Sequence, residues 1–235
     1  MTTWFGDFYR FSLGKKVVMA VTGIMLWGFV LVHMTGNLKY FYGPGDPEAP
    51  DPNAAINVYG EWLREVGSPF LPHSGTLWLL RIALLLALAL HVHAAYALTV
   101  MSRRARPVGY ERRRAVQIGW AERTMRWSGV ALLLFVVYHI LHFTTGQAHH
   151  DFVAGDVYHN MASAFSIGWV AAIYLVAMVL LGMHLYHGLW SLFQSLGWNH
   201  PRFNRWRRAF AVAFTLLIAI GFALVPLAIV SGIGF

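Results

Sequence analysis

Residues 166–194 read SIGWVAAIYLVAMVLLGMHLYHGLWSLFQ and contain no Asp, Glu, Lys or Arg. A helix needs about 20 mostly apolar residues to cross the hydrocarbon core of a bilayer. Backbone polar groups in lipid must be satisfied within the segment, which favours a helix, and the alternating polarity of a barrel strand is absent. The segment therefore predicts a transmembrane helix.

Four further stretches have the same apolar character. The chain is therefore predicted to be an all-α integral membrane bundle of five transmembrane helices, formed by a single domain over residues 1–235. The helices are expected at approximately 17–38, 76–101, 127–146, 166–194 and 209–232.

The composition agrees with a membrane location. Of the 235 residues, 57% are hydrophobic and 12% are charged, whereas soluble domains carry about 25% charged residues. The net charge of +8 does not by itself indicate a nucleic-acid-binding protein, and we expect none. The absence of cysteine excludes disulfides, zinc–thiolate sites and iron–sulfur clusters held by this chain. Imidazole is the abundant metal ligand, with 12 histidines.

Basic residues gather on one side of the predicted bundle. Fifteen of the 18 Lys and Arg residues lie within residues 10–16, 103–126 and 202–208. The positive-inside rule therefore predicts a cytoplasmic N-terminus and a C-terminus outside. The longest predicted outer loop covers residues 41–75, and INVYGEWLREV (residues 56–66) within it is expected to form a short interfacial helix.

Seven histidines fall inside the predicted spans, and each of the first four helices carries at least one. Ionisable residues inside a membrane mark function by default. A proton-coupled transporter with buried histidines and a non-haem iron oxygenase are two readings of this pattern. One inward histidine on each of four helices favours two haems, each held between two helices. Ligation by two imidazoles leaves no open position on the iron, which favours electron transfer over oxygen chemistry.

The depth of the histidines along their helices predicts how they pair. His33 and His139 lie roughly 10 Å from the outer ends of the first and third helices. His91 and His184 lie deeper, nearer the cytoplasmic side of the second and fourth helices. The predicted pairs are therefore His33 with His139 and His91 with His184.

Spacing does not decide between neighbouring histidines. His142 shares a helix face with His139, and His187 shares one with His184, so either member of each pair could ligate. His93 points to a different face from His91, so only one of these two can face a given haem.

Six sequence blocks resemble the di-haem cytochrome b subunit of succinate:quinone oxidoreductases. The resemblance is to the branch with one five-helix anchor subunit, which includes fumarate reductases, and it runs from about Ser12 to Pro201. The blocks are SLGKKVVMAVTG (12–23), LVHMTGNL (31–38), LHVHAAYALT (90–99), RRARPVGY (103–110), FVVYHILHFTTG (135–146) and HLYHGLWSLFQSLGWNHP (184–201).

The resemblance implies that His33, His91, His139 and His184 are the axial ligands of two haem b groups, in the pairs that depth predicts. His93, His142 and His187 match positions that are not ligands. It further implies a flavoprotein subunit with covalent FAD, an iron–sulfur subunit, and a quinone, commonly menaquinone. Succinate chemistry would lie in the partner subunits, in a complex of the bacterial cytoplasmic membrane. A haem b anchor of a membrane hydrogenase or formate dehydrogenase is the nearest alternative.

Other residues are candidates for contacts with these groups. We expect the basic cytoplasmic side, including Arg112, Arg113 and Arg114, to dock the flavoprotein and iron–sulfur subunits. Possible partners for the haem propionates are Arg10, Lys16, Arg126 and His187. An outer quinone site would draw on Trp62, Trp78, His149, His150 and His159.

Overall fold

The computed structural model describes residues 4–43, 51–105, 120–198 and 200–233, and these residues contain helices and no strand. Five helices are long and apolar enough to cross a membrane, which confirms the predicted fold class. They are α2 (Ser12–Asn37), α4 (Gly75–Arg104), α5 (Trp120–His139), α7 (Gly168–Ser195) and α8 (Asn204–Val230). The predicted orientation in the membrane stays a prediction, as does the docking role of Arg112, Arg113 and Arg114, which lie outside the described residues.

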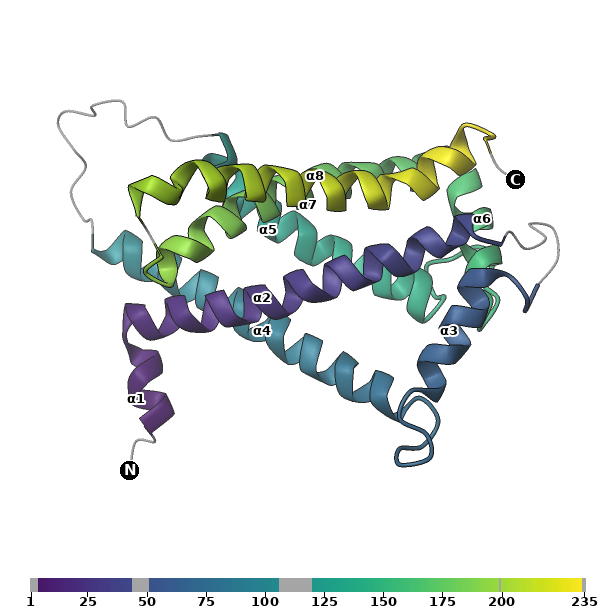
Figure 1. The fold of residues 1–235 in the computed structure, drawn as a ribbon, viewed down its shortest axis with the longest axis horizontal. Helices are drawn as coiled ribbons and strands as arrows, with labels where there is room; N and C mark the ends of the chain where they lie inside the picture. Colours follow the sequence, from purple (N-terminus) through teal and green to yellow (C-terminus); the bar gives the residue numbers. More distant parts are fainter. Residues whose placement is uncertain (1–3, 44–50, 106–119, 199, 234–235) are drawn as a thin grey trace.

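Short helices lie at the two ends of the bundle (Figure 1). Helix α1 (Trp4–Arg10) precedes α2 at one end, which we call the α1 end. At the other end, which we call the α3–α6 end, lie α3 (Ala55–Glu65) and α6 (Val157–Ser166). A helix is therefore present in the loop 41–75 as expected, its interfacial position stays a prediction, and α1 and α6 were not predicted. Short 3-10 turns, η1 (Leu38–Phe41) and η3 (Pro201–Phe203), follow α2 and precede α8.

Several helices begin earlier than the apolar stretches predict. Helix α2 begins at Ser12, so Lys15 lies in its early turns. The Lys15 ammonium donates to the carbonyls of Tyr9 at 2.6 Å and Arg10 at 3.0 Å. These are carbonyls at the C-terminus of α1, where a cation is favourable. The charged turn therefore belongs to the helix and joins α1 to α2.

The transmembrane helices form two closely packed pairs and one additional helix. Helix α2 packs along α4, and α5 packs along α7, while α8 packs along α7 and also contacts α2. Among the described residues, α2 does not pack closely along α5, nor α4 along α7. The bundle interior therefore lies between two helix pairs.

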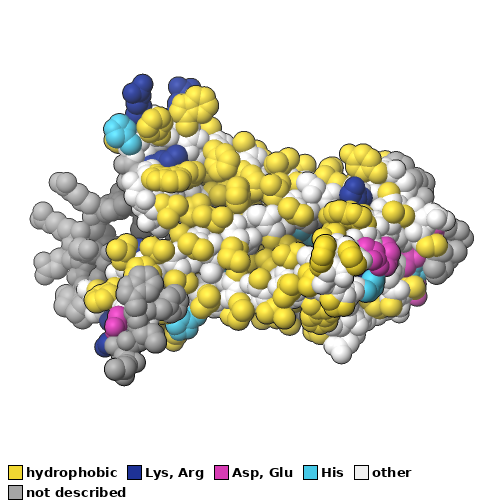
Figure 2. Space-filling model, turned by 60° about the horizontal axis from the view of Figure 1, so that its bottom comes forward, with side chains coloured by type: hydrophobic (Ala, Val, Ile, Leu, Met, Phe, Trp, Pro, Cys, Tyr) yellow, Lys and Arg dark blue, Asp and Glu magenta, His cyan; other side chains and the backbone are white. Residues whose placement is uncertain are grey.

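The flank of the bundle is apolar. Figure 2 shows hydrophobic side chains along the length of the molecule, with charged side chains gathered towards its ends. Large side chains on α4 and α5 are exposed, among them Leu86 at 59% and Leu134 at 66%. Such a continuous apolar surface is stable against lipid and not against water.

Buried polar contacts fasten the loops over the α3–α6 end. Asp156, which is 7% exposed, caps α6 by accepting from the His159 backbone N–H at 2.9 Å. Its carboxylate also accepts from the Asn57 amide at 2.8 Å and from the Asp51 backbone N–H at 3.1 Å. Asn57 in turn accepts from the Tyr158 backbone N–H at 3.0 Å. One carboxylate thus ties α3 to α6.

Replacing Asp156 with Ala should destabilise this end of the bundle. The substitution leaves three N–H donors without their acceptor, and each costs about 1 kcal/mol or more. We expect a lower thermal midpoint in detergent and faster proteolysis near residues 51–57. Glu65→Ala removes an exposed carboxylate from α3 and is the matched control. Equal proteolysis rates in the two variants would contradict the assigned role of Asp156.

Candidate functional site

The four histidines singled out in the sequence lie in two pairs inside the bundle. His33 of α2 faces His139 of α5, with ring centroids 5.8 Å apart. His91 of α4 faces His184 of α7, with ring centroids 6.4 Å apart. These are the pairs that helix depth predicts. Their role as haem ligands stays a prediction.

The spacing within each pair suits a shared metal ion. An imidazole nitrogen binds a metal at about 2 Å, so two rings on opposite sides of one ion have centroids about 6 Å apart. Both measured separations are close to this value. Each pair joins helices that do not pack closely along each other, so the rings meet across the interior of the bundle.

Two glycines allow the backbones of α2 and α5 to approach the rings of His91 and His184. A Cβ at Gly23 of α2 would lie 3.5 Å from His91 Cε1, and one at Gly129 of α5 would lie 3.6 Å from His184 Cε1. By contrast, Gly182 faces Thr215 and Ala219 of α8, where it serves helix packing. Gly23 and Gly129 therefore lie against histidine rings, whereas Gly182 serves helix packing.

These residues fit a haem. Each histidine pair has a spacing suited to one iron. The Nδ1 atom of His184 is buried and has no hydrogen-bond partner among the described residues. An apolar interior with a few directed nitrogens is typical of cofactor sites in helical bundles.

The three neighbouring histidines have other partners. His93 is exposed on α4, where its Nδ1 lies 2.7 Å from the Tyr9 hydroxyl of α1. The Nδ1 atom of His142 lies 2.9 Å from the hydroxyl of Tyr174 on α7. The Nε2 atom of His187 lies 3.1 Å from the hydroxyl of Ser191, one turn further along the same helix. In the described contacts none of these three rings faces a histidine of another transmembrane helix, and which histidines bind a metal stays a prediction.

A π-helical turn, η2 (Ile140–Thr144), directly follows His139. The sequence predicts one regular helix over residues 127–146, so this turn was missed. The Tyr174 hydroxyl lies 3.3 Å from Nδ1 of His139 as well as 2.9 Å from Nδ1 of His142. Such turns within helices often occur at functional sites, and here one tyrosine contacts both histidines.

The residues predicted for an outer quinone site differ in exposure, and their role stays a prediction. His149 and His159 are each 8% exposed, whereas Trp62 and Trp78 are each 59% exposed. His150 is exposed as well. None of the five lines either of the two grooves described on the helices.

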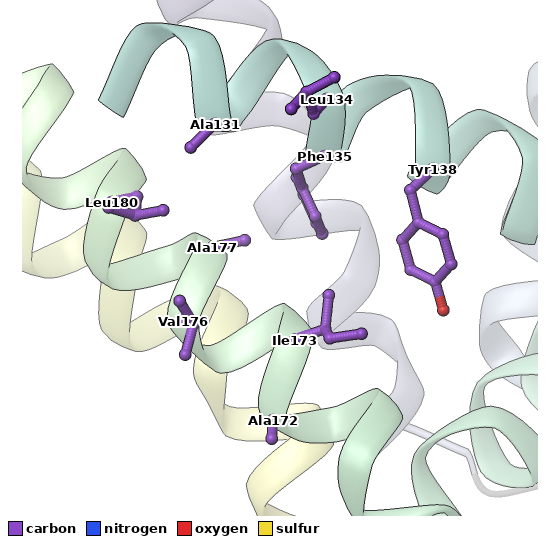
Figure 3. Close-up of a pocket in the computed structure, with 9 residues that line it drawn as sticks. All are labelled: Ala131, Leu134, Phe135, Tyr138, Ala172, Ile173, Val176, Ala177 and Leu180. Atoms are coloured by element: carbon purple, nitrogen blue, oxygen red, sulfur yellow. The ribbon is translucent and has the colours of Figure 1, made fainter. Parts of the chain in front are cut away.

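An apolar groove that the sequence analysis missed lies between α5 and α7 (Figure 3). It has a volume of about 460 Å³. The hydroxyl of Tyr138 is buried and has no hydrogen-bond partner among the described residues, and the ring of Tyr138 stacks on His142 with centroids 5.1 Å apart. The groove therefore ends beside the polar cluster around Tyr174. Its lining residues are Ala131, Leu134, Phe135, Tyr138, Ala172, Ile173, Val176, Ala177 and Leu180.

The role of the predicted propionate partners stays a prediction. Arg10, Lys16 and Arg126 are exposed, and His187 contacts Ser191. A buried cation near the α1 end was missed. Arg207 of α8 is 5% exposed and lies over the Trp190 ring of α7, 4.8 Å from its centroid.

An exposed group of possible metal ligands also lies on and after α3. The ligand atoms of Glu61, Glu65 and His73 lie within 4.8 Å of one another, and all three residues are exposed. The Arg64 guanidinium contacts the Glu61 carboxylate at 2.8 Å. Hydrogen bonds from His73 and Arg64 lower the pKa of Glu61 below its usual value. The Arg64 guanidinium therefore already pairs with one carboxylate of this cluster.

Comparison with protein-family models, curated proteins and solved structures finds no match to this chain. A functional assignment therefore depends on the residues described above.

Acidification should loosen the α3–α6 end through His149. Burial lowers the pKa of His149 from its usual 6.5. Its Nε2 contacts the Asn160 carbonyl at 2.9 Å and its Nδ1 accepts from the Asp151 backbone N–H at 3.1 Å, so a proton on Nδ1 would break the second bond.

The unfolded chain binds a proton at His149 more readily than the folded chain does, so stability falls as the pH drops below about 6.5. The loss of one hydrogen bond corresponds to about 1 kcal/mol. We expect a lower apparent thermal midpoint at about pH 5.5 than at about pH 7.5, and a smaller difference in His149→Gln. His73→Gln, at an exposed histidine, should keep the full difference. An unchanged pH dependence in His149→Gln would show that another group is responsible.

Proposed function

We propose that this chain is a membrane-bound cytochrome b that carries electrons between two haems, one held by His33 and His139 and the other by His91 and His184. The observation that carries the proposal is the placement of four histidines from four helices in two facing pairs, 5.8 and 6.4 Å apart. The iron of each bound haem would alternate between its ferric and ferrous states and so carry one electron.

The histidines supply neutral ligands in an apolar interior. A neutral imidazole offers one nitrogen to the metal while the other nitrogen donates a hydrogen bond that orients the ring. Nδ1 of His91 lies 3.2 Å from the Met19 carbonyl, so its Nε2 is the nitrogen available for a ligand. Nδ1 of His139 contacts the Tyr174 hydroxyl, which leaves Nε2 available there too.

The two pairs divide the thickness of the membrane. The ring of His91 lies beside Gly23 of α2, and His33 lies ten residues further along that helix, which is about 15 Å of helical rise. The hydrocarbon core is about 30 Å thick. Two sites at these depths would connect the two faces of the bilayer in short steps.

The finer proposal is the anchor subunit of a succinate:quinone oxidoreductase in a bacterial cytoplasmic membrane. Its support is the sequence resemblance over Ser12 to Pro201 together with the scarcity of soluble mass, since succinate chemistry would need partner subunits. A flavoprotein with covalent FAD and an iron–sulfur subunit would dock at the basic α1 end, and quinone, commonly menaquinone, would accept the electrons. Exposed arginines suited to such docking are Arg103, Arg104, Arg202, Arg205 and Arg208.

A proton-coupled transporter is the alternative that has an observation in its favour. Tyr174, His142 and His149 follow one another from the interior towards the α3–α6 end, with the His142 and His149 rings stacked 4.7 Å apart. Such a series could pass protons. A visible spectrum separates the two functions, because a sharp b-type band on reduction requires haem. Covalent flavin that purifies with the chain would then favour the succinate enzyme over a hydrogenase or formate dehydrogenase anchor.

Single alanine substitutions should divide the seven membrane histidines into two classes. His33→Ala and His139→Ala should each lose one of two haems, and it should be the same haem. His91→Ala and His184→Ala should lose the other haem or prevent assembly. Haem content and redox titration of the purified complex measure the outcome.

The matched controls are His93→Ala, His142→Ala and His187→Ala, whose rings contact other side chains. These variants should retain two haems, with potentials that shift at most. Two haems retained in His33→Ala, or one lost in His93→Ala, would overturn the ligand assignment.

A further inference from the structure

The chain contains an internal repeat that includes two of the proposed ligands. Residues 19–33 read MAVTGIMLWGFVLVH, and residues 125–139 read MRWSGVALLLFVVYH. The two segments match without a gap at six identical positions, and a seventh position is Thr22 in one and Ser128 in the other. Each segment ends on a histidine of the first pair, His33 or His139.

The repeated residues make the same contacts in both copies. Phe29 stacks on His33 with centroids 5.3 Å apart, and Phe135 stacks on His139 at 5.9 Å. The two glycines of the repeat also have matching neighbours: Gly23 lies beside His91, and Gly129 lies beside His184. The repeat is therefore structural as well as sequential.

Each copy begins a unit of two packed helices, α2 with α4 and α5 with α7. The first helix of a unit supplies His33 or His139, and the second supplies His91 or His184. Both histidine pairs thus consist of equivalent residues from the two units. This relation explains why the partners in each pair lie at the same depth.

The hydroxyl in the first copy orients a histidine of the second pair. Nδ1 of His91 lies 3.2 Å from both the Thr22 hydroxyl and the Met19 carbonyl. The Thr22 hydroxyl lies 2.7 Å from the Val18 carbonyl and donates to it, so its oxygen can accept from the imidazole N–H. The ring is held by Nδ1, and Nε2 remains for a ligand.

The second copy has the corresponding groups next to Gly129, which lies beside His184. Ser128 is 1% exposed and donates to the Met125 carbonyl at 3.0 Å. Nδ1 of His184 is buried without a hydrogen-bond partner among the described residues, beside Gly129 in the next position of the repeat. The Ser128 hydroxyl and the Met125 carbonyl are thus the repeat's equivalents of the groups that hold His91.

We propose that Thr22 and Ser128 are equivalent positioning residues, which orient His91 and His184 as the two ligands of one haem through their Nδ1 atoms. The inference rests on the proposed function and extends it to residues outside the ligand set. Hydroxyls inside helices often bond only to their own backbone. Nδ1 of His91 lies 3.2 Å from the Thr22 hydroxyl. Ser128 directly precedes Gly129, and a Cβ at Gly129 would lie 3.9 Å from Nδ1 of His184. These nitrogens of a second helix indicate the further role.

The proposal has a consequence that two unrelated structural hydroxyls would not share. An oxygen that accepts from Nδ1–H makes the imidazole more basic, which favours ferric over ferrous iron and lowers the reduction potential. Thr22→Val and Ser128→Ala, on different helices, should therefore raise the same one of the two haem potentials. A change of about tenfold in the relative affinity for the two oxidation states corresponds to about 59 mV for one electron.

The experiment is a potentiometric titration of the purified complex, with electron paramagnetic resonance of the oxidised haems. Thr22→Ser and Ser128→Thr keep the hydroxyl and should keep both potentials. Thr35→Val is the matched control, because Thr35 lies on the same helix as Thr22 and its hydroxyl donates only to the Val32 carbonyl at 2.8 Å in the described contacts.

The outcomes are distinct. Shifts of one shared potential in Thr22→Val and Ser128→Ala, with none in Thr35→Val, support the proposal. If Thr22→Val loses a haem, the proposal stands when that haem is the one lost in His91→Ala and when Thr22→Ser retains it. Shifts no larger than in Thr35→Val, or shifts of two different potentials, overturn it. A parent protein without haem would overturn the proposed function itself, before any variant is made.

Discussion

A neutral imidazole inside the hydrocarbon core has one nitrogen that donates and one that accepts, and both cost free energy if they stay without partners. The bundle contains histidines on four successive helices, so this cost recurs at several depths. At His91 and His142, a carbonyl or hydroxyl of a neighbouring helix offsets this cost. At His184, Nδ1 is buried without a hydrogen-bond partner among the described residues, although its ring faces His91. The facing pairs therefore contain nitrogens that a bound ligand would satisfy.

Helix packing is distributed accordingly. Helix α2 packs closely along α4, and α7 packs closely along both α5 and α8, so the rings can meet between the α2–α4 pair and the α5–α7 pair. Helix α8 carries no histidine and packs through small residues instead. Gly221 of α8 lies against Met34, and Gly182 of α7 lies against Thr215 of α8. Since lipid gives helices no hydrophobic reason to associate, such close approaches supply the dispersion contacts that hold α8 in place.

Much of this arrangement can be predicted from the sequence, because the apolar stretches are long and the histidines few. Equal depth correctly anticipates that His33 lies near His139 and His91 near His184. The π-helical turn after His139 could not be predicted, since nothing in residues 140–144 separates it from a regular helix. The contacts of Tyr174 and Thr22 could not be predicted either, because each residue contacts a histidine of another helix. The repeat of residues 19–33 in residues 125–139, by contrast, is visible in the sequence itself.

The two units are alike around His91 and His184 and differ beyond His33 and His139. Three residues after His139, the second copy has His142, which contacts Tyr174, whereas the first copy has Gly36 at the equivalent position. A Cβ at Gly36 would lie 3.1 Å from the ring of Tyr59 on α3, so that position serves packing. The cluster of His142 and Tyr174 therefore lies on the α5–α7 side, where the groove beside Tyr138 also ends. Because the α2–α4 and α5–α7 units are equivalent, their histidines form two matched pairs. Beyond His33 and His139 the two units differ in sequence, so the two sides of the bundle have different chemistry.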